Sequence, residues 1–119
     1  MSRTVIIDVD NQYLHFSAAH FTIFSATERE RLHGHNYSVR AKAETHVQDN
    51  GMAFDYNELK RALFTLCESL DEYTLLPTES KFMTVDKKAI GSDDYYAAEF
   101  NGQTMLLLQS DTLLLAVEN

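Results

Sequence analysis

Three histidines are the residues of this chain whose types and spacing most directly suggest chemistry. His33 and His35 are separated by one glycine in Leu-His-Gly-His-Asn-Tyr (32–37), and His20 ends the segment Phe-Ser-Ala-Ala-His (16–20). A metal site with three protein ligands leaves its fourth position open, which is the arrangement of a catalytic zinc rather than a structural one. The histidines therefore predict a metal-dependent enzyme, or a protein descended from one.

The segments that carry these histidines alternate between apolar and polar residues, as strands do. Residues 3–20 are predicted as one long extended segment whose apolar face ends at His20. Residues 33–48 continue the face of His33 and His35 as an apolar face, the pattern of a half-buried antiparallel sheet. If the two segments pair across the loop 21–32, the three imidazoles converge at one end of the sheet.

The alternative is that the three are ordinary core histidines, each satisfied by one hydrogen bond. Three such histidines in one small core would be costly without a common purpose, so we favour the metal site. His15 and His46 fall on the polar faces of their segments and are interpreted as solvent-exposed.

The candidates for proton transfer are acidic residues near these segments. Glu30 lies three residues before His33 within the run Glu-Arg-Glu-Arg (28–31). This run is either a solvated charged loop or the place of a general base that acts on a metal-bound substrate, and the spacing leaves both open. Asp71 and Glu72 end a predicted helix, where the macrodipole disfavours acidic side chains. Such a local conflict is typical of a functional site.

A helix is predicted over 56–70, after a turn at 48–54 around Asn50-Gly51. Asp55 is a plausible N-cap with Glu58 as its box partner. The apolar residues recur at helical spacing and predict packing on the sheet; they are Leu59, Ala62, Leu63, Leu66 and Leu70. Cys67 is interpreted as a small hydrophobic residue without a catalytic role.

Short β-like runs follow Pro77, at 82–85, 95–100, 104–109 and 113–117. Asn101-Gly102 predicts a hairpin between the second and third of them. Two long strands, a helix and then more strands indicate an α+β fold.

Composition limits the class of protein further. The 119 residues fit one domain, spanning 1–119, and the net charge of −8 argues against nucleic acid as the main partner. The single cysteine allows no intrachain disulfide, which favours a cytoplasmic location. The chain has no apolar signal segment and no apolar run of roughly 18 residues, so we expect neither secretion nor a membrane span.

Four motifs in order resemble the 6-pyruvoyltetrahydropterin synthase / 6-carboxytetrahydropterin synthase family. They are the two histidine motifs, Gly-Met-Ala-Phe-Asp-Tyr-Asn-Glu-Leu-Lys at 51–60 and Ser-Leu-Asp at 69–71. The resemblance implies the tunnelling fold, in which small α+β subunits oligomerise as trimers or hexamers and their sheets form a β-barrel. It also implies Zn²⁺ held by His20, His33 and His35, and a dihydropterin substrate, typically 7,8-dihydroneopterin triphosphate.

The chain departs from the family pattern at its acid–base residues. Members that make the pyruvoyl or carboxy product use a cysteine in the loop before His-Gly-His, and this loop has none. It resembles the branch in which a glutamate replaces that cysteine, here matched to Glu30, and which gives 6-hydroxymethyl-7,8-dihydropterin, a folate precursor. The family's Leu-Asp-His relay is Leu70-Asp71-Glu72 in this chain, so Asp71 matches and Glu72 replaces the histidine.

The resemblance further implies a C-terminal helix and strand, the latter carrying a glutamate that grips the pterin. Neither Glu99 nor Glu118 lies in a matching motif, so we expect the chain to lack this element or to obtain it from a complementing chain.

Two functions follow from these observations. The first is a zinc-dependent lyase of pterin biosynthesis, in a biopterin, queuosine or folate pathway. The second is a non-catalytic pterin- or zinc-binding homologue or assembly subunit. A cyclohydrolase-like activity on a related scaffold is a third and weaker alternative.

Overall fold

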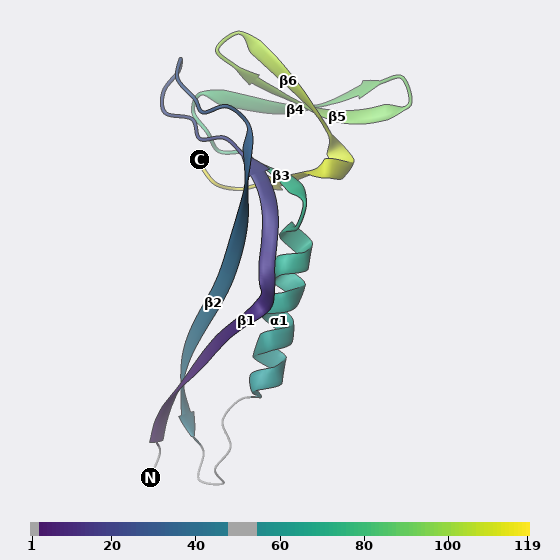
Figure 1. Cartoon of the computed structure of the whole chain (residues 1–119). Helices are drawn as coiled ribbons and strands as arrows, with labels where there is room; N and C mark the ends of the chain where they lie inside the picture. The colour runs from purple at the N-terminus through teal and green to yellow at the C-terminus, as the bar shows by residue number, and fades with distance from the viewer. Residues whose placement is uncertain (1–2, 48–54) are drawn as a thin grey trace. The chain divides into compact units, whose positions relative to one another are not determined.

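The computed structural model describes residues 3–47 and 55–119. Its elements in chain order are β1 (Arg3–His20), β2 (His33–Val47), α1 (Tyr56–Leu70), β3 (Tyr73–Pro77), β4 (Met83–Ile90), β5 (Asp93–Phe100), β6 (Gln103–Leu108), a 3-10 turn (Gln109–Asp111) and β7 (Thr112–Leu115) (Figure 1). The predicted α+β class is confirmed. The predicted turn at 48–54 lies outside the described residues.

The strands form a four-stranded sheet with the order β2-β1-β3-β7 and a three-stranded sheet with the order β4-β5-β6. As predicted, β2 runs back along β1 in the opposite direction (Figure 1). The larger sheet is nevertheless mixed, because β3 pairs in parallel with both β1 and β7. The cause is α1, a crossover that returns the chain before β3 begins, as parallel pairing requires.

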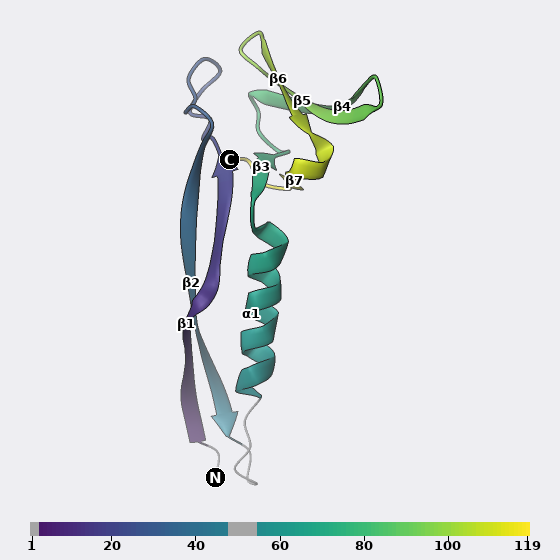
Figure 2. The ribbon, with the colours of Figure 1, turned by 45° about the vertical axis from the view of Figure 1, so that its right-hand side comes forward.

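The described residues fall into two compact units, one drawn from Met1–Phe16 with Asn36–Asp71, the other from Ser17–His35 with Glu72–Asn119. In the first unit α1 lies alongside β1 in both views (Figures 1 and 2). Its core is formed by buried Val9, Leu14 and Cys67, against which Ile7, Phe16, Val39, Leu59 and Leu63 pack.

Most of the predicted pattern holds in the first unit. Asp55 caps α1 by accepting a hydrogen bond from the Asn57 N–H at 2.8 Å. Leu66 was expected on the apolar face of the helix but is 53% exposed. Cys67 is buried instead. The side of α1 that packs on the sheet is formed by residues at four-residue intervals, namely Leu59, Leu63 and Cys67.

The second unit has its own core, formed by Phe21, Ile23, Leu76, Met83, Ala98 and Phe100. The predicted hairpin is confirmed, with positive φ angles of 49° at Asn101 and 74° at Gly102. A second hairpin turns at Gly91 (φ 62°) and makes β4 longer than predicted. The end of β4 is exposed on both faces, so it lacks the alternation that marks a half-buried strand.

Within the described part of the chain, no helix has the length and hydropathy that a bilayer crossing demands.

Candidate metal centre

The three histidines meet in the second unit. His20 is the last residue of β1, and His33 and His35 lie at the start of β2. The ring centroids are 4.9 Å apart for His20 and His33, 5.1 Å for His20 and His35, and 4.7 Å for His33 and His35. One nitrogen from each ring lies within 4.8 Å of the others. The predicted convergence of the imidazoles is therefore confirmed, because residues two apart on a strand project to one side.

The environment of His20 fits a metal ligand. Its ring is half-buried, and its Nε2 atom is buried without a hydrogen-bond partner among the described residues. A buried polar atom left unpaired costs free energy, and native structures avoid it unless an ion or water satisfies it. A cation held by the three rings would provide the missing partner of His20.

The second ring is prepared for the same role by a hydrogen bond. His33 Nδ1 donates to the Arg31 carbonyl oxygen at 2.7 Å, since a carbonyl can only accept. This bond places the proton of a neutral imidazole on Nδ1 and leaves the Nε2 lone pair for a ligand. A set of three neutral nitrogen ligands suits Zn²⁺ and also other divalent ions.

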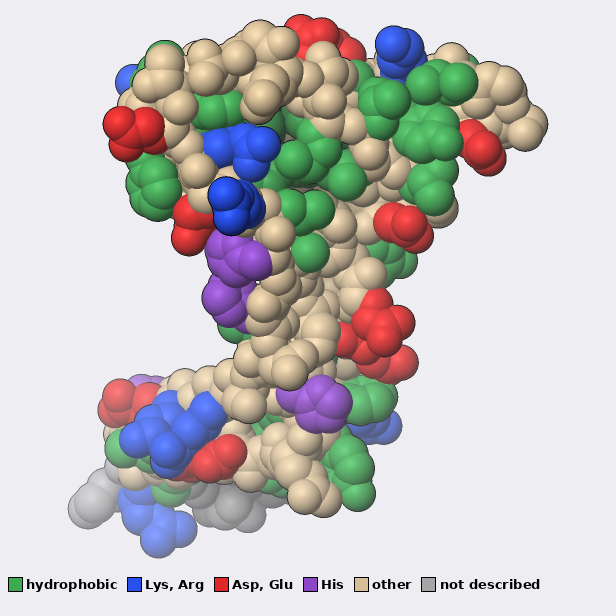
Figure 3. All heavy atoms as spheres, turned by 45° about the horizontal axis from the view of Figure 1, so that its top comes forward, with side chains coloured by type: hydrophobic (Ala, Val, Ile, Leu, Met, Phe, Trp, Pro, Cys, Tyr) green, Lys and Arg blue, Asp and Glu red, His purple; other side chains and the backbone are tan. Residues whose placement is uncertain are grey.

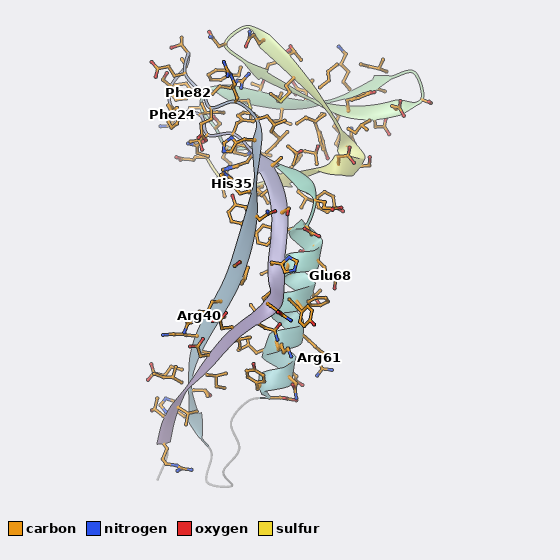
Figure 4. The ribbon with its side chains drawn as sticks, viewed as in Figure 1. Phe24, His35, Arg40, Arg61, Glu68 and Phe82 are labelled. Carbon is orange, nitrogen blue, oxygen red and sulfur yellow. The ribbon has the colours of Figure 1, made fainter. Side chains whose placement is uncertain are left out.

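His35 completes the cluster at the surface. It is exposed. Figure 4 labels it near the start of β2. On the face drawn in Figure 3, histidine side chains gather next to Lys and Arg side chains. This face is therefore not uniformly acidic, although the chain carries a net charge of −8. His15 and His46 are exposed, as predicted.

Glu30 is held in place by Thr22 rather than being freely solvated. Its Oε1 accepts a hydrogen bond from the Thr22 N–H at 3.0 Å, and its own N–H donates to the Thr22 carbonyl at 2.8 Å. The bond from Thr22 lowers the pKa of Glu30 against a rise from partial burial, and the neighbouring His33 and His20 rings lower it further. Glu30 is thus half-exposed but hydrogen-bonded to Thr22, and its role as a general base stays a prediction.

Two further contacts of this loop were not predicted from the sequence. The half-buried Arg29 guanidinium donates from Nη1 to the Glu30 carbonyl at 2.8 Å. The Asn119 side chain pairs with the backbone of Ile23, with distances of 2.8 Å and 2.9 Å. Arg29 appears in the sequence as one cation of a charged run, which does not show that its side chain turns back to the Glu30 backbone. Asn119 appears as a polar residue after an apolar strand, which does not reveal a partner 96 residues away.

Asp71 and Glu72 end α1 as predicted. Asp71 is the exposed C-cap and belongs to the first unit, whereas Glu72 and the histidines belong to the second. Glu72 is exposed with φ 64°, and its N–H donates to the Ser17 carbonyl at 2.7 Å. Among the described residues the cluster of possible metal ligands contains the three histidines without Glu30 or Glu72. The relay role of Asp71 and Glu72 stays a prediction.

Comparison with known proteins places this geometry in a family. Residues 11–100 match the sequence model described as 6-pyruvoyl tetrahydropterin synthase. A protein of Archaeoglobus fulgidus, provisionally assigned as a 6-carboxy-5,6,7,8-tetrahydropterin synthase, is 32% identical over 84 residues, which cover 71% of this chain and 69% of that protein.

Solved structures share the fold. The 6-pyruvoyl tetrahydropterin synthase of Plasmodium falciparum superposes with a TM-score of 0.78 at 26% identity, over 97% of this chain and 68% of that one. A Plasmodium vivax 6-pyruvoyltetrahydropterin synthase, in which a catalytic glutamate is replaced by alanine, gives the same TM-score of 0.78 at 23% identity, over 98% and 69% of the two chains.

Proposed function

Because this chain belongs to the 6-pyruvoyl tetrahydropterin synthase family, we propose that it is a zinc-dependent lyase acting on the side chain of 7,8-dihydroneopterin triphosphate. The observation that carries the proposal is the three-histidine cluster with the unpaired, buried Nε2 of His20. Its product would be 6-hydroxymethyl-7,8-dihydropterin, because the loop before His33 has a glutamate and no cysteine.

His20, His33 and His35 would hold the metal, with His33 oriented by the Arg31 carbonyl. Bound zinc would polarise the side-chain hydroxyls of the substrate and lower their pKa, so that a modest base suffices. The family's proton chemistry would then fall to acidic residues of this chain.

Glu30 would accept a proton from a substrate hydroxyl. Since the Thr22 N–H occupies Oε1, the Oε2 atom is the one that would take the proton. The lowered pKa of Glu30 keeps this carboxylate ionised at neutral pH, in the state that a base requires. The naming of a glutamate as catalytic in the Plasmodium vivax protein supports this assignment. Asp71 would support the relay, with Glu72 in place of the family's histidine.

We also propose a homo-oligomer, a trimer or hexamer, in which sheets of neighbouring subunits join into a barrel. The support is the strand order, which leaves β2 and β7 at the two edges of the larger sheet. Exposed strand edges are templates for pairing with another chain.

A non-catalytic pterin-binding homologue is the alternative, favoured by the replacement of the relay histidine by Glu72. The deciding experiment incubates zinc-loaded protein with 7,8-dihydroneopterin triphosphate and identifies the products by chromatography. We expect 6-hydroxymethyl-7,8-dihydropterin from the wild type and only a small residual rate from Glu30→Gln, with zinc retained in both. Substrate binding without turnover by the wild type would establish the alternative.

A further inference from the structure

The Arg29 guanidinium lies near two aromatic rings of the second unit. Its guanidinium carbon lies 5.4 Å from the ring centroid of Phe21 and 6.0 Å from that of Phe100. Both rings belong to the core and are only 4% and 6% exposed. A guanidinium over aromatic faces is attracted by their π-electrons and stacks as a rigid plane. Two buried rings therefore fix the position of the Arg29 head group.

The Arg29 side chain also forms a hydrogen bond with the main chain of the next residue, Glu30. Its Nη1 donates to the Glu30 carbonyl at 2.8 Å, while Thr22 accepts from the Glu30 N–H at 2.8 Å and donates to Oε1 at 3.0 Å. The backbone of Arg29 is itself bridged to Ile23. The N–H, the carbonyl and the carboxylate of Glu30 thus each have a partner, and Arg29 supplies the partner of the carbonyl.

We propose that Arg29 is a positioning residue, which fixes the Glu30 backbone so that the Glu30 carboxylate is presented to the three-histidine site in one orientation. This inference rests on the proposed function of Glu30. It assigns to Arg29 no contact with substrate or metal, only the placement of the residue that follows it.

The contact is made to the backbone, and this determines what a substitution should change. Arg29 donates to the main-chain carbonyl of Glu30, whereas the Glu30 carboxylate is held by the hydrogen bond from the Thr22 N–H. Removing Arg29 should therefore reduce the fraction of time that Glu30 is correctly placed and hydrogen-bonded to Thr22.

Arg29→Met is the informative substitution. Arg29, Phe21 and Phe100 line a recess of about 470 Å³ together with Met83 and Met105, so a methionine side chain has room among apolar neighbours. Methionine keeps the apolar stem and loses the guanidinium. Arg29→Lys keeps the charge without the planar fork and should give an intermediate result. Lys88→Met, which removes an exposed cation from β4 of the same unit, is the matched control.

The first readout does not depend on activity. Amide hydrogen exchange of Thr22 and Glu30, followed by NMR in metal-free and zinc-loaded protein, reports whether the two hydrogen bonds between these residues persist. Arg29→Met should lower protection of both amides roughly tenfold. Arg29→Lys should lower it less, and Lys88→Met should leave it unchanged.

The second readout separates positioning from general loss of structure. With 7,8-dihydroneopterin triphosphate as substrate, Arg29→Met should lower kcat roughly tenfold with KM unchanged. The same substitution in a Glu30→Gln background should cause no further loss in residual turnover, because Arg29 acts only through Glu30.

Unchanged protection of the Thr22 and Glu30 amides in Arg29→Met would overturn the proposal. An equal loss of kcat when Arg29→Met is made in the wild type and in Glu30→Gln would overturn it too. If Arg29→Met does not fold, Arg29→Lys must still show the partial loss of protection, and wild-type protection in that variant also overturns the inference. If protection falls as expected while the wild type converts no pterin, the proposed function fails and the positioning role of Arg29 stands.

Discussion

The side chain of Asn119 forms a two-point amide pair with the backbone of Ile23. Its Oδ1 accepts from the Ile23 N–H at 2.8 Å, and its Nδ2 donates to the Ile23 carbonyl at 2.9 Å. Ile23 is 6% exposed and belongs to the core of the second unit. The pair thus satisfies both main-chain groups of a buried residue in the loop that leads to Glu30.

Asn119→Ala should therefore destabilise the protein through two buried groups that lose their partner. We expect a loss of about 1–3 kcal/mol in the free energy of unfolding, measured by urea denaturation. Asn11→Ala is the matched control, because Asn11 accepts a hydrogen bond from the Tyr13 N–H at an exposed position of β1. The control should change stability by less than about 0.5 kcal/mol. Equal effects of the two substitutions would contradict the role given to Asn119.

Zinc should stabilise the folded protein through the three histidines. At a free concentration of about one hundred times its Kd, zinc is expected to raise the free energy of unfolding by about 2.7 kcal/mol. His20→Ala should abolish this gain and the bound metal. His15→Ala, which removes an exposed histidine from the same strand, should keep both. Thermal unfolding with and without a chelator, together with metal analysis, measures the difference; a gain that survives in His20→Ala would exclude His20 as a ligand.

The position of Glu30 predicts a pH dependence of stability. Its pKa in the folded state is lowered from 4.5, first by the hydrogen bond from Thr22. A carboxyl whose pKa is lower in the folded state stabilises the protein at pH above its unfolded value and loses that contribution as pH falls through the folded pKa. The stability gap between wild type and Glu30→Gln should thus narrow as pH falls below 4.5. Urea midpoints of the metal-free proteins across this range provide the test, and a gap that widens toward acid would refute the assignment.

The convergence of the three histidines could be predicted from the sequence because it depends on local geometry. His33 and His35 share a face by the period of a strand, and His20 ends the neighbouring strand in phase with them. Similarly, Asn101-Gly102 specifies its hairpin because its backbone angles are positive.

The supports of the site could not be predicted, because their partners are distant along the chain. Arg29 contacts Phe100, a residue of β5, only in the folded chain. Asn119 likewise contacts Ile23 across 96 residues of sequence. A single sequence shows the charged run around Glu30 and not the core that immobilises it. Strand β3 was not predicted, because its five residues, which end in Pro77, are too few to show an alternation of apolar and polar residues.

Substitutions of Glu72 test whether this residue is retained for function although its backbone conformation lowers stability. It follows the C-cap of α1 with φ 64°, a left-handed conformation, and its N–H donates to the Ser17 carbonyl at 2.7 Å. This conformation is unfavourable for a residue with a Cβ by about 1–2 kcal/mol, so Glu72→Gly is expected to stabilise the protein by about 1 kcal/mol. Urea denaturation measures the gain.

Glu72→Ala is the companion variant, because it removes the carboxylate and keeps the backbone strain. If the carboxylate takes part in the proton relay, both variants lose turnover of 7,8-dihydroneopterin triphosphate, although only Glu72→Gly is more stable than the wild type. Retained turnover in both would remove Glu72 from the relay and leave Asp71 as its acidic member. Natural sequences keep a strained residue where function requires it, so we expect the first outcome: a more stable Glu72→Gly protein that is less active.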